Sequence, residues 1–161
     1  SLKSVPAWLT TDNINQVLRD AQMEGDIGLL SLDIDGNDYW IWQALTAVHP
    51  AVAVIEYNAS FGPTRSVTIP YDAAFNINAA HASRWYHGAS LTALTKLAHA
   101  KGLALVGCES NGVNAFFARR DLLGNGLAEM TPAEAYYPHF QRPGEPESQF
   151  ATISSLPLIT I

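Results

Sequence analysis

The sequence predicts an α/β domain built around a parallel sheet, and three observations lead to this prediction. An apolar run at residues 28–34 is bounded by Gly25 and Gly36, as is typical of a strand that is buried on both faces. A second apolar run, at residues 51–56, precedes a polar turn. Between these two runs, apolar residues recur with helical spacing, which predicts a helix that crosses from one parallel strand to the next.

Helices are expected wherever apolar residues recur at i, i+3, i+4 and i+7. The expected helices cover residues 14–21, 41–48 and 91–98, and their ends are expected at Gly25, Pro50 and Gly102. The pair Thr11-Asp12 is expected to cap the first helix. A further short helix is expected at Thr131-Pro132-Ala133-Glu134, which has the form of a capping box with proline at the first helical position.

The rest of the chain is expected to complete a single α/β domain over residues 1–161. Residues 59–88 are too aromatic for a solvated linker, so we expect a packed excursion over the carboxyl edge of the sheet. Residues 103–106 and 114–118 predict two further strands joined as an antiparallel hairpin. Residues from about 138 to 161 are expected to form an irregular C-terminal arm, whose last residues dock as a strand or an extended segment.

Composition excludes several classes of function. The 161 residues carry a net charge of −6 with a pI near 5.2, and they contain no basic stripe that would neutralise the phosphates of a nucleic acid. The apolar stretches are shorter than the roughly 20 residues that a membrane span needs. Cys108 is the single cysteine, which excludes an internal disulfide and fits a reducing compartment. We therefore expect a cytoplasmic protein that binds neither nucleic acid nor membrane.

An acidic cluster follows the first predicted strand. Asp33, Asp35, Asn37 and Asp38 lie at its carboxyl end, which is where open α/β sheets bind their ligands. One interpretation is structural, because these side chains can satisfy the free amides of the next helix. Another is binding of Mg²⁺ or Ca²⁺, although the glycine lies too early for a calcium loop. A third is contact with a cofactor or substrate, and we assign no metal ligand from the sequence.

The second predicted strand ends in Glu56-Tyr57-Asn58, which is expected to lie beside Asp35. Two neighbouring carboxylates can raise each other's pKa and perform acid–base chemistry, so Asp35 and Glu56 are the candidate catalytic residues. The alternative is a hydrogen-bonded loop closure. The candidate residues for binding substrate or cofactor are Asp33, Asn37, Tyr57 and Asn58.

Aromatic residues of the excursion are expected to form a wall above these polar groups. They are Phe61, Tyr71, Phe75, Trp85 and Tyr86. The base of the site is expected to lack positive charge, which favours neutral polyols, amines or a divalent cation over anions, unless Arg65 or Arg84 points inward. His81 and His87 lie on the same excursion and are candidates for a general base.

Four segments of the chain resemble one protein family. They read L-L-S-L-D-I-D-G-N-D-Y-W-I-W, V-I-E-Y-N, G-A-S-L-T-A-L and G-L-A-L-V-G-C-E-S-N-G-V-N-A-F-F-A-R. Together they resemble the C-terminal half of class I S-adenosylmethionine (SAM)-dependent methyltransferases of the FkbM-like type, from about Asp12 to Asp121. The resemblance implies half of a Rossmann-like sheet with strand order 4-5-7-6, three parallel strands and one antiparallel, and helices on both faces. It also implies methyl transfer to oxygen of a sugar or small metabolite.

The chain departs from this family in the part that binds the cofactor. These 161 residues contain no glycine-rich turn that follows a strand, and such a turn holds the methionine part of SAM in the family. We therefore expect a truncated methyltransferase-like domain that binds no cofactor by itself, and SAM only when the missing half is supplied. The alternative is a stand-alone homodimeric module that binds a small molecule or a protein. For either function we expect a homodimer that forms through the exposed edge of the first strand or by exchange of residues 153–161, unless the tail folds back onto its own chain.

Overall fold

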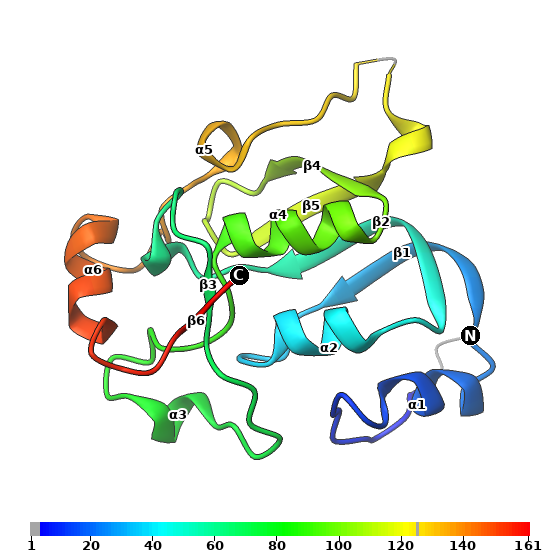
Figure 1. The fold of residues 1–161 in the computed structure, drawn as a ribbon, viewed down its shortest axis with the longest axis horizontal. Coiled ribbons are helices and arrows are strands. Elements are labelled where there is room, and N and C mark those ends of the chain that lie inside the picture. The colour runs from blue at the N-terminus through cyan, green and yellow to red at the C-terminus, as the bar shows by residue number, and fades with distance from the viewer. Residues whose placement is uncertain (1–3, 125) are drawn as a thin grey trace.

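A four-stranded mixed sheet forms the centre of the computed structural model, which describes residues 4–124 and 126–161 (Figure 1). Its strands are β1 (Gly25–Leu32), β2 (Val48–Glu56), β4 (Leu103–Cys108) and β5 (Asn114–Arg119). They lie in the order β1-β2-β5-β4; β1 and β2 are parallel, and β5 is antiparallel to both of its neighbours. The predicted α/β class, the β4–β5 hairpin and the strand order are confirmed.

Helices connect and flank these strands. The α-helices are α1 (Ile14–Asp20), α2 (Asp38–Ala44), α3 (Ile77–Ala80), α4 (Leu91–Ala100), α5 (Pro132–Ala135) and α6 (Pro146–Ile153). Two 3₁₀ turns, η1 (Ala59–Phe61) and η2 (Arg120–Leu122), complete the set. The predicted capping box is confirmed, because the Thr131 side chain accepts from the Glu134 amide while the Glu134 carboxylate accepts from the Thr131 amide. None of the helices in the described ranges has the length and apolar character needed to cross a membrane.

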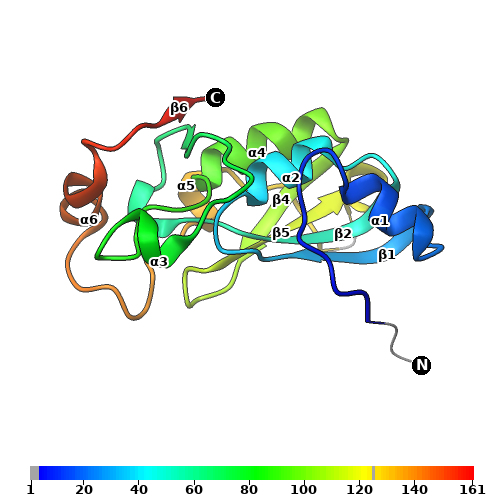
Figure 2. The same cartoon turned by 90° about the horizontal axis from the view of Figure 1, so that it is seen from below.

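One face of the sheet is covered by helices. Figure 2 shows α1, α2 and α4 on the same side of the strands. The prediction of helices on both faces is therefore wrong for the described part of the chain. Leu29 of β1 points to the opposite face and is 61% exposed. The register places it beside Val52, and Val54 and Phe116 share that face two residues further along. This uncovered face is apolar, although it is only partly exposed.

The main core lies between the sheet and its helices. The rings of Trp42 from α2 and Phe117 from β5 pack with their centroids 5.1 Å apart, and both side chains are buried. Leu94 of α4 and Ile55 of β2 are completely buried in the same cluster. Burial of such side chains stabilises the fold by roughly 1.5–3 kcal/mol each. The core therefore fixes the helical layer on the sheet and holds the carboxyl ends of β1 and β2 in place.

Two predicted boundaries are wrong near Pro50. The helix predicted for residues 41–48 is α2, which ends at Ala44, and β2 already begins at Val48. Pro50 thus lies inside a strand instead of ending a helix. A proline has no amide to donate to a neighbouring strand, but β5 pairs with β2 only from Val52 onward. The missing donor therefore costs β2 no hydrogen bond to β5.

The excursion and the C-terminal arm pack against each other. The short strands β3 (Val67–Thr68) and β6 (Ile159–Thr160) pair antiparallel, which confirms that the last residues dock as a strand. The arm was expected to be irregular, yet residues 146–153 form α6. Phe61 and Ile69 of the excursion form a second core with Ile153 of α6. The C-terminal arm therefore holds the excursion over the end of the sheet.

Candidate functional site

Three carboxylates meet at the carboxyl ends of β1 and β2. In the parallel register, Leu32 lies beside Ile55, so the next residues along the two strands, Asp33 and Glu56, are also neighbours. Asp35 follows two residues later. One oxygen atom from each of these three carboxylates lies within 4.8 Å of the others. The predicted meeting of Asp35 and Glu56 is thus present in the structure.

Asp38 holds the loop of residues 33–37 in place. Its carboxylate is completely buried and accepts hydrogen bonds from the amides of Ile34, at 2.9 Å, and Gly36, at 3.0 Å. Burial raises its pKa to about 6 despite these bonds. The expected capping role is therefore corrected, because Asp38 binds amides of the loop before α2. Asp35, at the tip of this loop, has a φ of +56°, a left-handed conformation that aspartate tolerates better than most residues.

Glu56 has the most perturbed carboxyl group of the site. Its side chain is only 11% exposed, and no hydrogen-bond partner for Oε2 is found among the described residues. Burial, followed by the charges of Asp38, Asp33 and Asp35, raises its pKa to about 9. Glu56 is therefore protonated near neutral pH. The direction of this shift is the one predicted for neighbouring carboxylates, but burial contributes more than charge.

His87 faces Glu56 from the end of the excursion. Its Nδ1 lies 3.8 Å from Oε2 of Glu56 and likewise has no hydrogen-bond partner in the described ranges. Its Nε2 lies 2.9 Å from a guanidinium nitrogen of Arg142, and a guanidinium only donates. Nε2 is therefore the acceptor, and the neutral ring has its proton on Nδ1. Burial, with the charge of Arg142 next, lowers the pKa of His87 to about 3.

Arg142 connects the C-terminal arm to this site. Besides His87, its guanidinium donates to Oδ1 of Asn58 at 2.7 Å and to Oγ of Ser60 at 2.8 Å. The Ser60 hydroxyl in turn donates to the buried side chain of Gln149. Burial lowers the pKa of Arg142 to about 10, while the nearby Glu56 opposes that shift. Arg142 is thus a fixed cation that orients the imidazole of His87.

These groups line a polar pocket of about 350 Å³. Its lining includes Asp35, Glu56 and His87, together with the two cations Arg84 and Arg142. The prediction that the site lacks positive charge is therefore wrong. Arg65 is not among the pocket residues, because it pairs with Glu147 and lies over the ring of Phe150.

The predicted aromatic wall is mostly wrong as well. Of its five members, only Trp85 lines the pocket. Phe61, Phe75 and Tyr86 belong to the second core, and the hydroxyl of Tyr71 accepts from the amide of Thr11. Most of these side chains are instead buried against the C-terminal arm, because exposing so many apolar groups to water is unfavourable.

Three of the predicted binding residues have structural roles. Asn37 donates from Nδ2 to the carbonyl of Asp72 at 2.8 Å. The buried hydroxyl of Tyr57 donates to the carbonyl of Tyr137, and burial raises its pKa. Asn58 donates to the carbonyls of Trp85 and His87 and thereby positions His87. Asp33 remains a candidate for binding because it lies in the carboxylate cluster.

From the sequence, His87 was only one of two candidate bases, and Arg142 was not predicted to be part of the site. Arg142 lies 55 residues beyond His87 and 84 beyond Asn58. It belongs to a segment rich in proline and glycine, where periodicity gives no information about contacts. The sequence feature that could have indicated its role is that Arg142 is the only lysine or arginine between residues 121 and 161.

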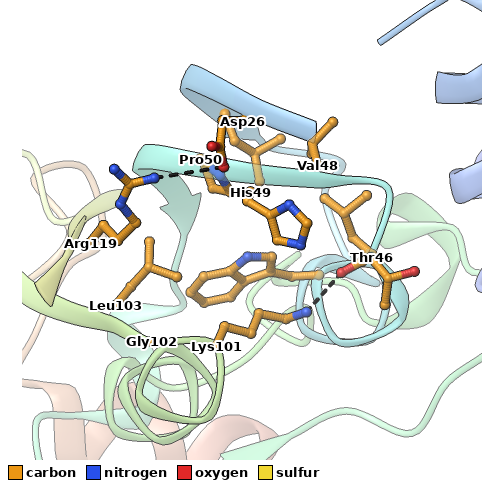
Figure 3. A pocket seen from close by; sticks show the side chains of 12 residues that line it. Asp26, Thr46, Val48, His49, Pro50, Lys101, Gly102, Leu103 and Arg119 are labelled. Carbon is orange, nitrogen blue, oxygen red and sulfur yellow. Dashed lines mark hydrogen bonds and ion pairs between the residues drawn. The ribbon is translucent and has the colours of Figure 1, made fainter. Parts of the chain in front are cut away.

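A second pocket, of about 360 Å³, lies at the opposite end of the sheet (Figure 3). Its lining includes Trp42, and Figure 3 shows Arg119 pointing toward Asp26, with which it forms an ion pair. Arg119 also pairs with Asp121, and Lys101 donates to the carbonyl of Leu45. This pocket lies at the amino ends of β1 and β2, and its charged groups have partners. The buried atoms without partners, Oε2 of Glu56 and Nδ1 of His87, favour the first pocket as the functional site.

Comparisons of the chain with models of protein families, with curated proteins and with solved structures found no match.

Proposed function

We propose that this chain is the acceptor-binding part of an α/β domain of the class I methyltransferase type, and that it binds a hydroxylated small molecule. The main support is the pair of buried atoms without partners, Oε2 of Glu56 and Nδ1 of His87, at the wall of the polar pocket. Buried polar atoms in native proteins are nearly always hydrogen-bonded, so atoms left unpaired here suggest a ligand. The strand order β1-β2-β5-β4, with its single reversed strand, is compatible with the proposed class.

A hydroxyl group suits this pair of atoms. The two atoms are 3.8 Å apart but closed to solvent, so one oxygen atom comes within hydrogen-bond distance of both only after neighbouring side chains of the pocket move aside. Such an oxygen accepts from Nδ1–H of His87 and exchanges a hydrogen bond with the carboxyl of Glu56. Asp35, at the exposed side of the pocket, is the proposed acceptor of the hydroxyl proton. Methyl transfer to oxygen requires the removal of this proton.

The residues of this chain do not fit the cofactor. Within these 161 residues, no glycine-rich turn follows a strand, so we derive no step through SAM. Titration of the chain with SAM in a calorimeter is expected to show no binding tighter than about millimolar, because such folds hold a nucleotide cofactor with the glycine turn and a nearby acidic residue. Micromolar affinity would contradict the view that another part of the protein, or another polypeptide, binds the cofactor.

Acceptor binding is tested with ligand-observed NMR. The panel contains neutral glycosides and polyols, small amines and small carboxylates. We expect binding by hydroxylated neutral compounds, and a roughly tenfold loss of affinity in Glu56→Leu, since this variant removes a buried hydrogen-bond partner of the ligand, which costs about 1.4 kcal/mol. Asp26→Asn, which changes the second pocket, is the matched control and should bind like the wild type. Failure of all hydroxylated compounds to bind, or a loss in Asp26→Asn alone, would contradict the proposal.

The second candidate function is a homodimeric interaction module, and the exposed edge of the sheet favours it. Among the described residues β1 pairs only with β2, and Leu29 on the uncovered face of β1 is 61% exposed. Unpaired apolar edges readily associate. The exchanged tail is not supported, because β6 pairs with β3 of the same chain. We propose that, in this case, two copies associate edge to edge through β1.

Sedimentation velocity tests the dimer. A concentration-dependent dimer is expected for the wild type, and Leu29→Lys should weaken it because lysine on an edge strand opposes edge-to-edge pairing. Leu122→Lys places the same charge at another exposed leucine and should leave the dimer intact. A wild-type monomer at every concentration, or equal effects of the two variants, would reject this candidate.

A further inference from the structure

The second pocket, at the amino ends of β1 and β2, has the size and lining of a small-molecule site (Figure 3). Its volume of about 360 Å³ lies within the range of roughly 300–1,000 Å³ that is typical of ligand pockets, which are mostly apolar with a few polar groups that orient the ligand. We propose that this pocket binds a small monocarboxylate whose body is an aromatic ring or a short alkyl chain. The pocket lies at the opposite end of the sheet from the proposed acceptor site, so the inference does not rest on the proposed function.

The fold leaves this space open for two reasons. The lining comes from residues that follow α2 and α4 and from the first residues of β1, β2 and β4, so the cavity lies where the two helices end against the sheet. In addition, Gly28 of β1 lies between Asp26 and Leu30, and the alternation of side chains along a strand places all three positions on the same face. A β carbon at Gly28 would meet no atom within 4 Å, so no side chain fills the space beside it.

Apolar side chains form the inner wall of the pocket. Trp42, Leu45, Val48 and Leu103 all line it, although none of them is more than 5% exposed. These side chains belong to the main core and present only a small part of their surface to the cavity. A ligand with an apolar body would remove both its own surface and this wall from water, and the hydrophobic effect favours such burial.

Lys101 gives the pocket a positive charge that no carboxylate neutralises. Its ammonium donates to the carbonyls of Leu45, at 2.9 Å, and Gln43, at 3.3 Å. An ammonium has three donors, and neither a third acceptor nor an ion-pair partner for Lys101 is found among the described residues. Burial also lowers the pKa of Lys101, because the ammonium has lost part of its hydration. A ligand carboxylate beside Lys101 would accept the remaining hydrogen bond and supply the missing counter-charge.

Two further nitrogen-bearing side chains of the lining are available to a carboxylate. Figure 3 shows the ring of His49 and the ammonium of Lys101 on one side of the pocket, and the guanidinium of Arg119 on another. The imidazole of His49 has no hydrogen-bond partner within the described ranges, so it is free to donate to a ligand. Asp26, the acidic residue of the lining, is 82% exposed and lies 3.8 Å from Arg119, which offsets its charge. The pocket therefore favours an anion over an amine.

Ligand-observed NMR with matched probes tests the charge of the ligand. The probes are benzoate and 3-phenylpropionate, the uncharged amides of both acids, and phenethylamine. We expect the two carboxylates to bind roughly tenfold more tightly than their amides, because hydrogen bonds to an ionised acceptor are stronger, and we expect the amine to bind more weakly than either amide. Equal affinities of acids and amides, or tighter binding of the amine, would overturn the proposal. Absence of binding by both carboxylates at millimolar concentration would do so as well.

Lys101→Met keeps the apolar stem of the side chain and removes its charge. This variant is expected to weaken the binding of the two acids roughly tenfold and to change the affinity of the amides much less, whereas a general loss of structure would weaken all four. Lys96→Met is the matched control, because Lys96 donates to the carbonyl of Ile161 and does not line the pocket. Equal effects of the two variants, or equal weakening of acids and amides in Lys101→Met, would overturn the proposal.

Gly28→Leu tests the location of the site without changing any charge. The leucine side chain would enter the open space beside Asp26 and Leu30, so binding of acids and amides should be lost, and circular dichroism checks that the variant is folded. In the wild type, the amide signals of residues 45–49 and 101–103 are expected to shift first when benzoate is added. Unchanged binding in Gly28→Leu would overturn the proposal. Shifts centred on residues 84–87 and Arg142 would also overturn it, because they would place the carboxylate in the polar pocket.

Discussion

Replacing Arg142 with methionine is expected to lower the free energy of unfolding by about 3–5 kcal/mol. Its guanidinium donates to Asn58, Ser60 and His87 at 2.7–2.9 Å, and the residue is largely buried. Methionine keeps much of the side-chain volume but donates nothing, so three buried acceptors lose a donor. Each such loss costs about 1–3 kcal/mol, and the effects are not fully additive.

Arg120→Met is the matched control for this prediction. Arg120 also makes two hydrogen bonds, to the two carboxylate oxygens of Glu129, but this pair is exposed at the surface. Exposed ion pairs contribute about 0–1 kcal/mol, so the control should unfold nearly as the wild type does. Urea unfolding followed by circular dichroism gives both values. Equal losses in the two variants would show that the buried network adds no stability beyond that of a surface pair.

A second measurement on the Arg142 variant reports on the site itself. After burial, Arg142 is the main cause that lowers the pKa of His87. The pKa of His87, followed by NMR, should therefore rise when Arg142 becomes methionine. An unchanged value would mean that burial alone holds the imidazole neutral.

The sequence was sufficient to predict the sheet and the meeting of its acidic residues. The apolar run before Asp33 and the one before Glu56 have the length and composition of parallel strands, and parallel strands bring their carboxyl ends to one edge. Turn chemistry was equally informative, since the capping box at Thr131 and Glu134 formed as predicted. These features depend on neighbours in the sequence or on regular strand pairing, which local patterns encode.

The remainder of the site depends on contacts that local patterns do not encode. His87 and Arg142 come from two irregular segments that meet only because β3 pairs with β6 and α6 packs on η1. The aromatic residues of the excursion could either line the pocket or pack in a second core. Burial against α6 decided this, and α6 was not predicted because its apolar residues are few, although Pro146 at its first position is typical of a helix start. The charge of the pocket was therefore mispredicted for the same reason.

The protonated state of Glu56 gives the protein an unusual dependence of stability on pH. In the unfolded chain this carboxyl ionises near its ordinary pKa of 4.5, whereas in the folded protein its pKa is raised to about 9. Between these values the folded state binds one more proton than the unfolded state. Stability therefore falls as pH rises through this window, by up to about 1.4 kcal/mol per pH unit. Below about pH 6.5, His87 opposes this trend, because it is neutral when folded and charged when unfolded.

Above neutrality only the Glu56 contribution remains large, so we expect the free energy of unfolding to fall by about 2 kcal/mol between about pH 7 and about pH 8.5. Glu56→Gln removes the titrating group and should make this part of the profile nearly flat, with stability relative to the wild type increasing as pH rises. Glu129→Gln is the control, because this exposed carboxylate has a pKa lowered by its hydrogen bond to Arg120 and is ionised throughout the window. Urea unfolding at several pH values, with a chelator present, gives all three profiles. A wild-type profile as flat as that of Glu56→Gln would mean that Glu56 is ionised in the folded protein, and the acid–base chemistry proposed for the pocket would then have to start from a carboxylate.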